Sequence, residues 1–383
     1  MGDERIAIVG IGETATARSL DATLPELLCE AVELAAHDAG LAISDIDGIV
    51  TETGFMPPHC YDIAASYGLS PDIFIGHTGL GGAGTIGSPA LASIAIRSGA
   101  ARNVLCLFGV KWGSETGAAY AYHSADPFKA NLELPYGFFP QAAYMATSAR
   151  QYLDRYGRTE VELAQVAIVT REWASLHPAA GKREPLSLDD YFASPLVADP
   201  LRNVDCCLLS DGAAAFIMSP IEVARDLRSE VIAVSGCGRS VEPITEHAYL
   251  SIRPDLLSLG SRISAPKAIE RAGLTAAEID VVEIYDCFSI NTVIQLEDAG
   301  FCGRGEALDL YAERTSAPGG RLPVNTHGGL LSHSYLLGIS HVCEAVTQLR
   351  HEAGDRQVDG ARSAFVSGLA AMDHASLVLM RDG

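Results

Sequence analysis

The sequence has few basic residues and few aromatic residues. Lysine and arginine together number 27, against 48 for aspartate and glutamate, and aromatic residues make up 7% of the 383 residues. The formal net charge is −21 at pH 7. Proteins that bind nucleic acid in general need a basic surface that neutralises phosphates, so this composition argues against that function. An anionic cofactor held by a few local arginines stays compatible with it.

The sequence also lacks cysteine pairs and long apolar runs. None of the nine cysteines forms a C-x-x-C pair, so neither a zinc ribbon nor a thioredoxin-like site is indicated, and we expect no metal site. An odd number of scattered cysteines suits a reducing compartment. No signal-peptide pattern precedes the first expected strand, and no apolar run approaches the roughly 20 residues that span a bilayer. These absences predict a soluble cytoplasmic protein without a membrane partner.

Two familiar phosphate-binding motifs are incomplete. Gly10 and Gly12 give a G-x-G after a buried strand, but Thr14 and Ala15 follow where a third glycine is needed, so the dinucleotide fingerprint is weak. The glycine-rich residues 77–87 carry no Lys-Ser or Lys-Thr, which excludes a Walker phosphate loop. A glycine cluster that leads into an apolar helix indicates close backbone packing near a site.

Apolar residues make up 48% of the chain and alternate between strand and helix patterns, which predicts an α/β protein. Ala39-Gly40-Leu41, followed by Asp45-Ile46-Asp47, matches Ala272-Gly273-Leu274, followed by Glu278-Ile279-Asp280, at the same spacing. We therefore expect two similar halves, 1–228 and 229–383. The proline-containing residues 112–200 interrupt the first half as an excursion or lid that covers a site. Strands are expected at 5–12, 47–51, 103–108, 214–218, 231–235, 281–285, 364–368 and 375–380, and helices at 24–40, 89–97, 141–156, 161–176 and 290–299.

Residues 321–350 carry the densest set of candidate functional side chains. A short apolar run ends in Asn325, and the pair Gly328 and Gly329 follows. Next come the polar cluster Ser332, His333, Ser334 and Tyr335, and then the apolar residues Leu336, Ile339, Val342, Val346 and Leu349 at helical spacing. The pattern places the polar cluster at the N-terminal end of a helix, where unpaired N–H groups favour an anionic or polarised oxygen. A helix cap with a hydrogen-bonded histidine is the plainer interpretation.

Five motifs in order resemble the thiolase superfamily, and the resemblance covers nearly the whole chain. They are the glycine-rich turn with the helix end Ala95–Gly99, Ser210-Asp-Gly-Ala-Ala, Tyr285-Asp-Cys-Phe, Asn325-Thr-His-Gly-Gly and the terminal Ser367-Gly. The sequence is most similar to the sterol-carrier-protein thiolases and their bacterial lipid-transfer-protein relatives. The resemblance implies a thiolase fold with duplicated α-β-α-β-α halves in a five-layered core, a loop-domain insertion and a homodimer.

The reactive positions of that family differ in this sequence. The family's nucleophilic cysteine falls at Gly82, and its catalytic histidine falls at Tyr335, two residues after His333. The second catalytic cysteine corresponds to Ser367, and the Asn or His before the acidic-x-Phe motif corresponds to Tyr285. Acyl transfer through a thiolate needs a nucleophile beside an activating base. That chemistry is therefore absent from these positions.

Two tyrosines at the reactive positions resemble the thiolase-fold aldolases that shorten steroid side chains. The resemblance implies retro-aldol cleavage of a β-hydroxyacyl-CoA, with coenzyme A as part of the substrate, no covalently bound cofactor, and a small partner protein carrying an OB fold and a zinc ribbon. Such a partner would make a heterotetramer with the dimer. We assign Tyr335 as the base, activated by a helix N-terminus, and Tyr285 as the acid or enolate donor, although the two roles can be exchanged. His327 or N–H groups near Gly328 would hold the thioester oxygen, and we expect Gly82, Asn325, Gly328, Ser367 and His333 to contact substrate.

Two other functions fit the same residues. The first is a thiolase-like acyltransferase that uses Cys287, the one cysteine within a motif near the inferred site. The second is a non-catalytic subunit that binds acyl-CoA or lipid for a partner. The acyl group stays open, because an aromatic or branched β-hydroxyacyl-CoA suits the residues as well as a steroid side chain.

Overall fold

The computed structural model describes residues 5–52, 60–115, 125–138, 141–242, 253, 255–370 and 372–382. Within them, nine strands form one sheet in the order β3-β2-β4-β7-β1-β8-β11-β10-β9, and β5 (Leu196–Ala198) and β6 (Leu201–Arg202) pair separately. The nine are β1 (Ile6–Glu13), β2 (Gly48–Glu52), β3 (Phe74–Thr78), β4 (Val104–Lys111), β7 (Asp211–Pro220), β8 (Val231–Val241), β9 (Val281–Ile284), β10 (Ser363–Leu369) and β11 (Asp373–Asp382). In the described residues, a short antiparallel β1–β8 ladder joins the two halves of the sheet.

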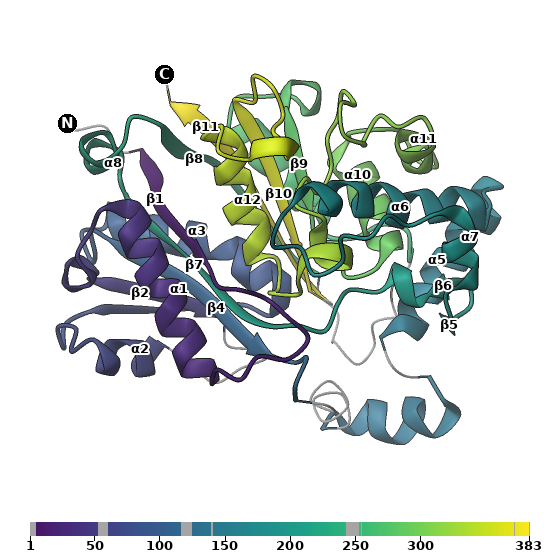
Figure 1. Ribbon diagram of the computed structural model, residues 1–383, viewed down its shortest axis with the longest axis horizontal. Helices are drawn as coiled ribbons and strands as arrows, with labels where there is room; N and C mark the ends of the chain where they lie inside the picture. The colour runs from purple at the N-terminus through teal and green to yellow at the C-terminus, as the bar shows by residue number, and fades with distance from the viewer. Residues whose placement is uncertain are drawn as a thin grey trace.

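Helices divide the molecule into five layers (Figure 1). Helix α1 (Leu24–Ala39) covers β1, β4 and β7, and α9 (Ser261–Arg271) covers β8 and β11. Between the two halves of the sheet lie α3 (Gly81–Arg97) and α12 (Ile339–Leu349), each of which contacts strands of both halves. The order is helix, sheet, helix pair, sheet, helix, which confirms the α/β five-layered fold that the resemblance implied.

The two halves repeat one topology. The units β1-α1-β2 and β8-α9-β9 each end their helix at a left-handed glycine, Gly40 with φ 68° and Gly273 with φ 72°. A short 3-10 turn follows each glycine, at Ile43–Asp45 and Ala276–Glu278. The strand orders β2-β4-β7-β1 and β9-β10-β11-β8 also correspond. The motif repeat in the sequence therefore marks equivalent positions of two copies of one unit.

The excursion after Trp112 contains two long helices, α5 (Ala142–Tyr156) and α6 (Glu160–Leu176), close to their expected positions, and the short α7 (Leu188–Ala193). Thr159 and Glu162 form a capping box at the start of α6. Helix α6 packs against α10 (Ser289–Ala299), α11 (Ala307–Ala312) and the π-helical turn η7 (Gly329–His333). The loop that follows α6 donates its N–H groups to the carbonyls of η7. Two further short helices are α2 (Cys60–Ser66) and α8 (Ile221–Leu227).

Three local expectations were wrong. Helix α3 begins at Gly81 rather than at Pro89, so the glycine cluster is helical and buried between the two halves of the sheet. Strand β3 was missed because Gly76 interrupts its apolar run. Helix α12 begins at Ile339, after the left-handed Gly338, so the polar cluster 332–335 precedes it, with Ser332 and His333 in η7 and the other two residues in the connection that follows.

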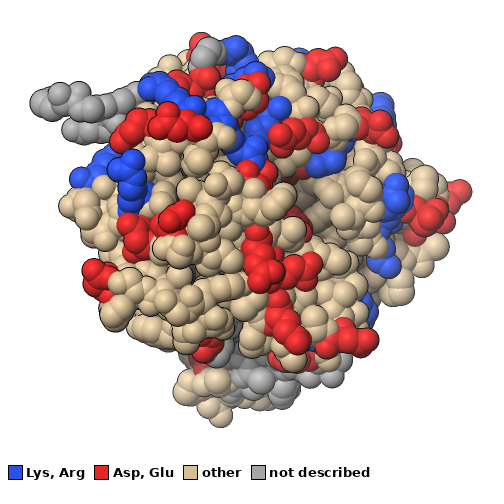
Figure 2. All heavy atoms as spheres, turned by 60° about the vertical axis from the view of Figure 1, so that its left-hand side comes forward, with Lys and Arg blue, Asp and Glu red and all other residues tan. Residues whose placement is uncertain are grey.

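Acidic side chains form a band down one face of the molecule, and basic side chains gather at the upper edge of the same face (Figure 2). All nine cysteines are free thiols, which includes the adjacent Cys206 and Cys207. In the described part of the chain, no helix combines the length and the apolar character that crossing a membrane requires.

Candidate active site

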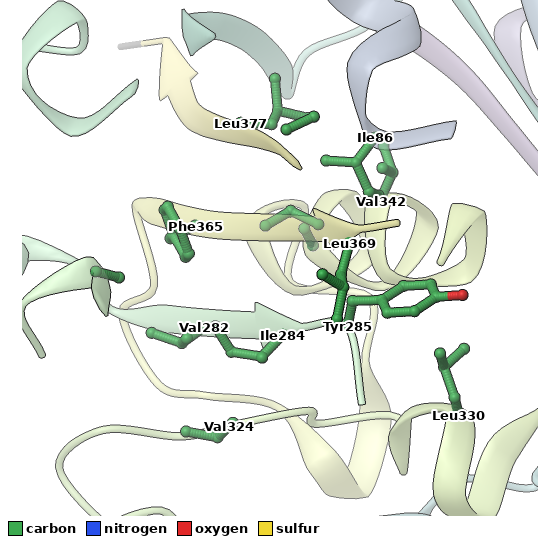
Figure 3. Packing of buried hydrophobic residues seen from close by; sticks show 14 of the residues in the cluster. Ile86, Val282, Ile284, Tyr285, Val324, Leu330, Val342, Phe365, Leu369 and Leu377 are labelled. Atoms are coloured by element: carbon green, nitrogen blue, oxygen red, sulfur yellow. The ribbon is translucent and has the colours of Figure 1, made fainter. Parts of the chain in front are cut away.

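The hydroxyl oxygens of Tyr285 and Tyr335 lie 3.0 Å apart, and either can donate the hydrogen bond. Tyr285 directly follows β9, and Tyr335 stands between η7 and α12. In Figure 3 the Tyr285 ring leaves the packed aliphatic side chains at the end of β9 and carries its hydroxyl away from them. Tyr335 is half-buried and packs on Trp112, with ring centroids 5.1 Å apart. The structure thus brings together the two tyrosines that the motif positions had singled out.

Gly82 lies directly against Tyr285. A Cβ atom added at Gly82 would come within 2.2 Å of Cε2 and 2.5 Å of Cδ2 of the Tyr285 ring. Such approaches are far shorter than van der Waals contact, so the ring occupies the space of a side chain at position 82. A cysteine at the family's nucleophile position and this tyrosine conformation are therefore sterically incompatible.

Asn325 and Ser367 support the strand end that carries Tyr285. The Asn325 Oδ1 accepts from the Ile284 N–H at 2.7 Å, and its Nδ2 donates to the Ile284 carbonyl at 3.0 Å. Gln295 Nε2 donates to the Tyr285 carbonyl at 2.8 Å, and Ser367 Oγ donates to Gln295 Oε1 at 2.8 Å. Both expected substrate contacts thus direct their polar atoms to the protein frame around Tyr285.

The glycine pair Gly328 and Gly329 permits close packing within the protein. A Cβ atom on Gly328 would lie 2.5 Å from that of Ala174 in α6, and one on Gly329 would lie 2.0 Å from Oδ2 of Asp286. The Gly328 N–H already donates to the Asn325 carbonyl at 2.8 Å. Asp286 also accepts from the Leu330 N–H at 2.7 Å. The Gly328 N–H is therefore not available to a thioester oxygen.

His327 and His333 belong to a row of four imidazoles, of which three are buried and His177 is half-buried. The ring centroids of His177 and His333 are 4.6 Å apart, those of His333 and His327 are 5.0 Å apart, and those of His327 and His341 are 4.7 Å apart. Burial holds the pKa of His327 and of His333 well below the usual histidine value, so both rings are neutral. In the described residues, no hydrogen bond or ring contact joins His327 to either tyrosine of the pair.

His327 and His333 instead line a cavity of about 390 Å³. Its other walls include Glu13 from β1, Glu344 from α12 and Arg356. His333 also has its Nδ1 2.9 Å from Ser334 Oγ and 3.6 Å from Glu13 Oε1. The two histidines therefore face a space that is not lined by the tyrosine pair.

Burial raises the pKa of both tyrosines well above the usual value. The neighbouring Tyr335 is the second cause that raises the pKa of Tyr285. For Tyr335 the second cause is Cys207, whereas the hydrogen bond from Tyr285 lowers the pKa of Tyr335. The expected lowering by a helix N-terminus is absent, because Tyr335 lies four positions before Ile339, the first residue of α12. Tyr335 is thus the member of the pair whose phenolate is stabilised by a donated hydrogen bond.

Sequence patterns missed several residues of this site. Trp112 lies at the start of the excursion, and Gln295 lies inside α10, where neither position belongs to a motif. The helical spacing between Gln295 and Asn291, which also contact each other, was the available signal. Cys287 is buried, which raises its pKa to about 12, and Asn291 Nδ2 donates to its sulfur at 2.9 Å.

A five-layered duplicated α/β fold, with a hydrogen-bonded tyrosine pair packed against Gly82, defines a thiolase-type protein. Residues 243–381 match the family model described as a thiolase C-terminal domain-like domain. The chain belongs to the thiolase superfamily, in the branch that includes the steroid side-chain aldolases.

Relatives that match over nearly their full length support this assignment. The chain is 34% identical to the steroid side-chain-cleaving aldolase of Thermomonospora curvata over 98% of each chain. It is 30% identical to the 17-hydroxy-3-oxo-4-pregnene-20-carboxyl-CoA lyase of Mycobacterium tuberculosis over 97% of this chain and 98% of that one. The solved Ltp2-ChsH2(DUF35) aldolase superimposes with a TM-score of 0.90 at 31% identity, covering 99% of this chain and 98% of the other.

Proposed function

We propose that the protein is a carbon–carbon lyase that cleaves a β-hydroxyacyl-CoA by a retro-aldol reaction. The observation that carries this proposal is the hydrogen-bonded pair Tyr285 and Tyr335 beside Gly82, since it supplies two proton-transferring groups and no nucleophile. Retro-aldol cleavage needs a base for the β-hydroxyl proton and an acid for the α-carbon, but it needs no covalent intermediate. The site therefore fits this reaction better than acyl transfer.

In the proposed mechanism the two phenols exchange roles through their hydrogen bond. Tyr335, as phenolate, accepts the β-hydroxyl proton while the bond between Cα and Cβ breaks, which leaves a carbonyl product and a thioester enolate. Tyr285 then donates its proton to Cα of the enolate. Transfer of the new Tyr335 proton across the 3.0 Å contact restores the starting pair, so the cycle consumes no net proton.

The substrate is proposed to be a CoA thioester with a bulky acyl group, such as a steroid side chain. Named substrates and partners of the relatives support this choice. Arg150, Arg155 and Arg158 on the excursion are all paired with carboxylates, so they are poor candidates for the CoA phosphates. Lys182 and Arg183 are exposed on the loop that binds the η7 carbonyls, and we propose that they contact the nucleotide. A dimer and a small DUF35-type partner are proposed to complete the working assembly.

The acyltransferase alternative depends on Cys287. Its raised pKa, about 12, leaves a negligible thiolate fraction near neutral pH. The Asn291 amide on its sulfur is not a base. The Cys287→Ala variant is therefore expected to keep full activity, and loss of activity in that variant, with iodoacetamide inactivation of the wild type, favours acyl transfer.

The proposal is tested with Tyr285→Phe and Tyr335→Phe. Either change is expected to reduce kcat for cleavage of a β-hydroxyacyl-CoA by about 100-fold or more, as removal of a general acid or base does, with an unchanged circular dichroism spectrum. Tyr311→Phe is the matched control, because Tyr311 is buried and its hydroxyl has no hydrogen-bond partner in the described residues. Full activity of both phenylalanine variants would contradict the catalytic roles of the two tyrosines, whereas a wild-type protein that binds acyl-CoA without cleaving it would favour the non-catalytic role.

A further inference from the structure

Three buried side chains with metal-binding atoms lie on the segments that carry the tyrosine pair. They are Glu283 in β9, His327 in the loop that precedes η7, and His341 in α12. Each side chain offers one ligand atom, and these atoms lie within 4.8 Å of one another. Glu283 and His341 are fully buried, and His327 is 1% exposed. No spacing rule connects positions 283, 327 and 341, so the sequence alone predicted no metal there.

Four polar atoms of this cluster lack hydrogen-bond partners in the described residues. They are Oε2 of Glu283, both ring nitrogens of His327, and Nδ1 of His341. Each unsatisfied buried polar group costs about 1–3 kcal/mol, and native proteins contain few of them. Two of the four, the Oε2 of Glu283 and the Nδ1 of His327, make an ion-pair contact with each other at 3.0 Å, whereas the Nε2 of His327 and the Nδ1 of His341 have no hydrogen-bond partner in the described residues.

The other polar atom of Glu283 and the other ring nitrogen of His341 are each held by hydrogen bonds. Glu283 Oε1 accepts from the N–H of Thr326 at 3.0 Å and from its hydroxyl at 2.9 Å. His341 Nε2 lies 3.0 Å from the Ile284 carbonyl, which can only accept, so Nε2 carries a hydrogen and Nδ1 has a lone pair whenever the ring is neutral. Metal-binding carboxylates and imidazoles are typically fixed in this way by bonds from their far atoms.

We propose that Glu283, His327 and His341 bind one divalent first-row transition-metal ion. Two imidazoles and one carboxylate favour zinc, iron or cobalt over magnesium and calcium, which prefer oxygen ligands. Two ligand atoms about 2.1 Å from one ion and at right angles are about 3.0 Å apart. The Glu283–His327 separation of 3.0 Å agrees with that arrangement.

Charge and access are consistent with a cation. Glu283 is joined by Asp286, whose Oδ1 lies 3.4 Å from Nε2 of His341, whereas the nearby Glu344 is already paired with Arg356 at 2.8 Å. His327 also lines the 390 Å³ cavity, which offers a route for the ion and room for water at its open coordination positions. The bound ion would join β9, the 326–328 loop and α12, and so position both tyrosines without touching substrate.

The test uses the purified full-length chain, stripped with a chelator and then dialysed against Zn²⁺ or Co²⁺. We expect about one ion per chain by mass spectrometry of the metal, and visible cobalt absorption bands of nitrogen and oxygen coordination. Glu283→Gln and His341→Gln are expected to lower the bound metal at least tenfold. His374→Gln is the matched control, because His374 is also buried and unpartnered among the described residues but lies outside the cluster.

Two results would overturn the proposal. One is a folded wild-type protein that binds no ion at tenfold molar excess, and the other is equal metal content in the wild type and both cluster variants, which indicates adventitious surface binding. If the variants do not fold, the cobalt spectrum of the wild type decides, since a spectrum identical to that of aqueous cobalt excludes the site. Metal content is independent of cleavage activity, so this test stands apart from that of the lyase.

Discussion

The ring of Tyr285 fills the space next to Gly82 that any side chain at that position would need. The nearest ring carbon lies 2.2 Å from the position of a Cβ atom on Gly82. A side chain at position 82 and the present conformation of Tyr285 therefore exclude each other.

Gly82→Ala is expected to displace the Tyr285 ring. The extra methyl group overpacks the site, which typically costs about 1–3 kcal/mol of stability, and it separates the two hydroxyls, so cleavage activity should fall at least tenfold. Gly87→Ala on the same helix is the control, because its Cβ would make ordinary van der Waals contact with Ala375 at 3.5 Å. That variant should keep activity and gain up to about 1 kcal/mol in urea unfolding. Equal activity of the two variants contradicts the steric argument.

The rate of cleavage is expected to rise with pH. Burial raises the pKa of Tyr335 above the usual tyrosine value, so only a small fraction is phenolate at neutral pH. As the pH increases from about 7 to 9, that fraction and kcat/KM should grow about tenfold per unit. The measurement is kcat/KM against pH, with Tyr335→Phe as the control. A plateau already present at pH 7 is inconsistent with Tyr335 as the base.

Much of the fold was predictable because each half repeats one unit. Gly40 and Gly273 end equivalent helices, and the motif match around them identifies the repeat from the sequence alone. The start of α3 was not predictable, since glycines 81–87 have poor helix propensity and form helix only because both halves of the sheet pack on them. That long-range packing cannot be inferred from the local sequence.

The candidate site was likewise predictable only in part. Tyr285 and Tyr335 were found because motif spacing fixes their family positions, and the structure places their hydroxyls in contact. His327 shares its motif with Asn325, yet its ring points to Glu283 and His341. Side-chain direction depends on the left-handed backbone of Asn325, with φ 55°, and such a turn is not readable from residue type alone.

Asn325→Asp is expected to destabilise the strand end that carries Tyr285. The carboxylate retains an acceptor for the Ile284 N–H, but it replaces the donor to the Ile284 carbonyl with a buried, unpaired charge. Urea unfolding at about pH 8 should show a loss of roughly 3 kcal/mol, and less near pH 5, where the new carboxyl can be protonated. If the Asn325→Asp variant is as stable as the wild type at about pH 8, this expectation is wrong.

Buried neutral histidines are expected to make the protein less stable in acid, and His374 gives the clearest case. Its ring is fully buried, and burial, followed by the charges of Arg253 and Arg262, lowers its pKa to about 3. The unfolded chain binds a proton on this histidine near pH 6.5, whereas the folded chain does not until about pH 3. Stability is therefore lost as the pH falls below about 6.5, at roughly 1.4 kcal/mol per pH unit for this group.

His374→Gln removes the proton that this histidine binds in the unfolded chain but not in the folded chain. Between about pH 6.5 and 5, the free energy of unfolding of the variant should depend on pH less steeply than that of the wild type, by the equivalent of about one proton. The slope decides, since the substitution changes the stability at neutral pH through packing as well. Because other buried groups titrate identically in both proteins, an unchanged slope in His374→Gln means that the ring is protonated in the folded state.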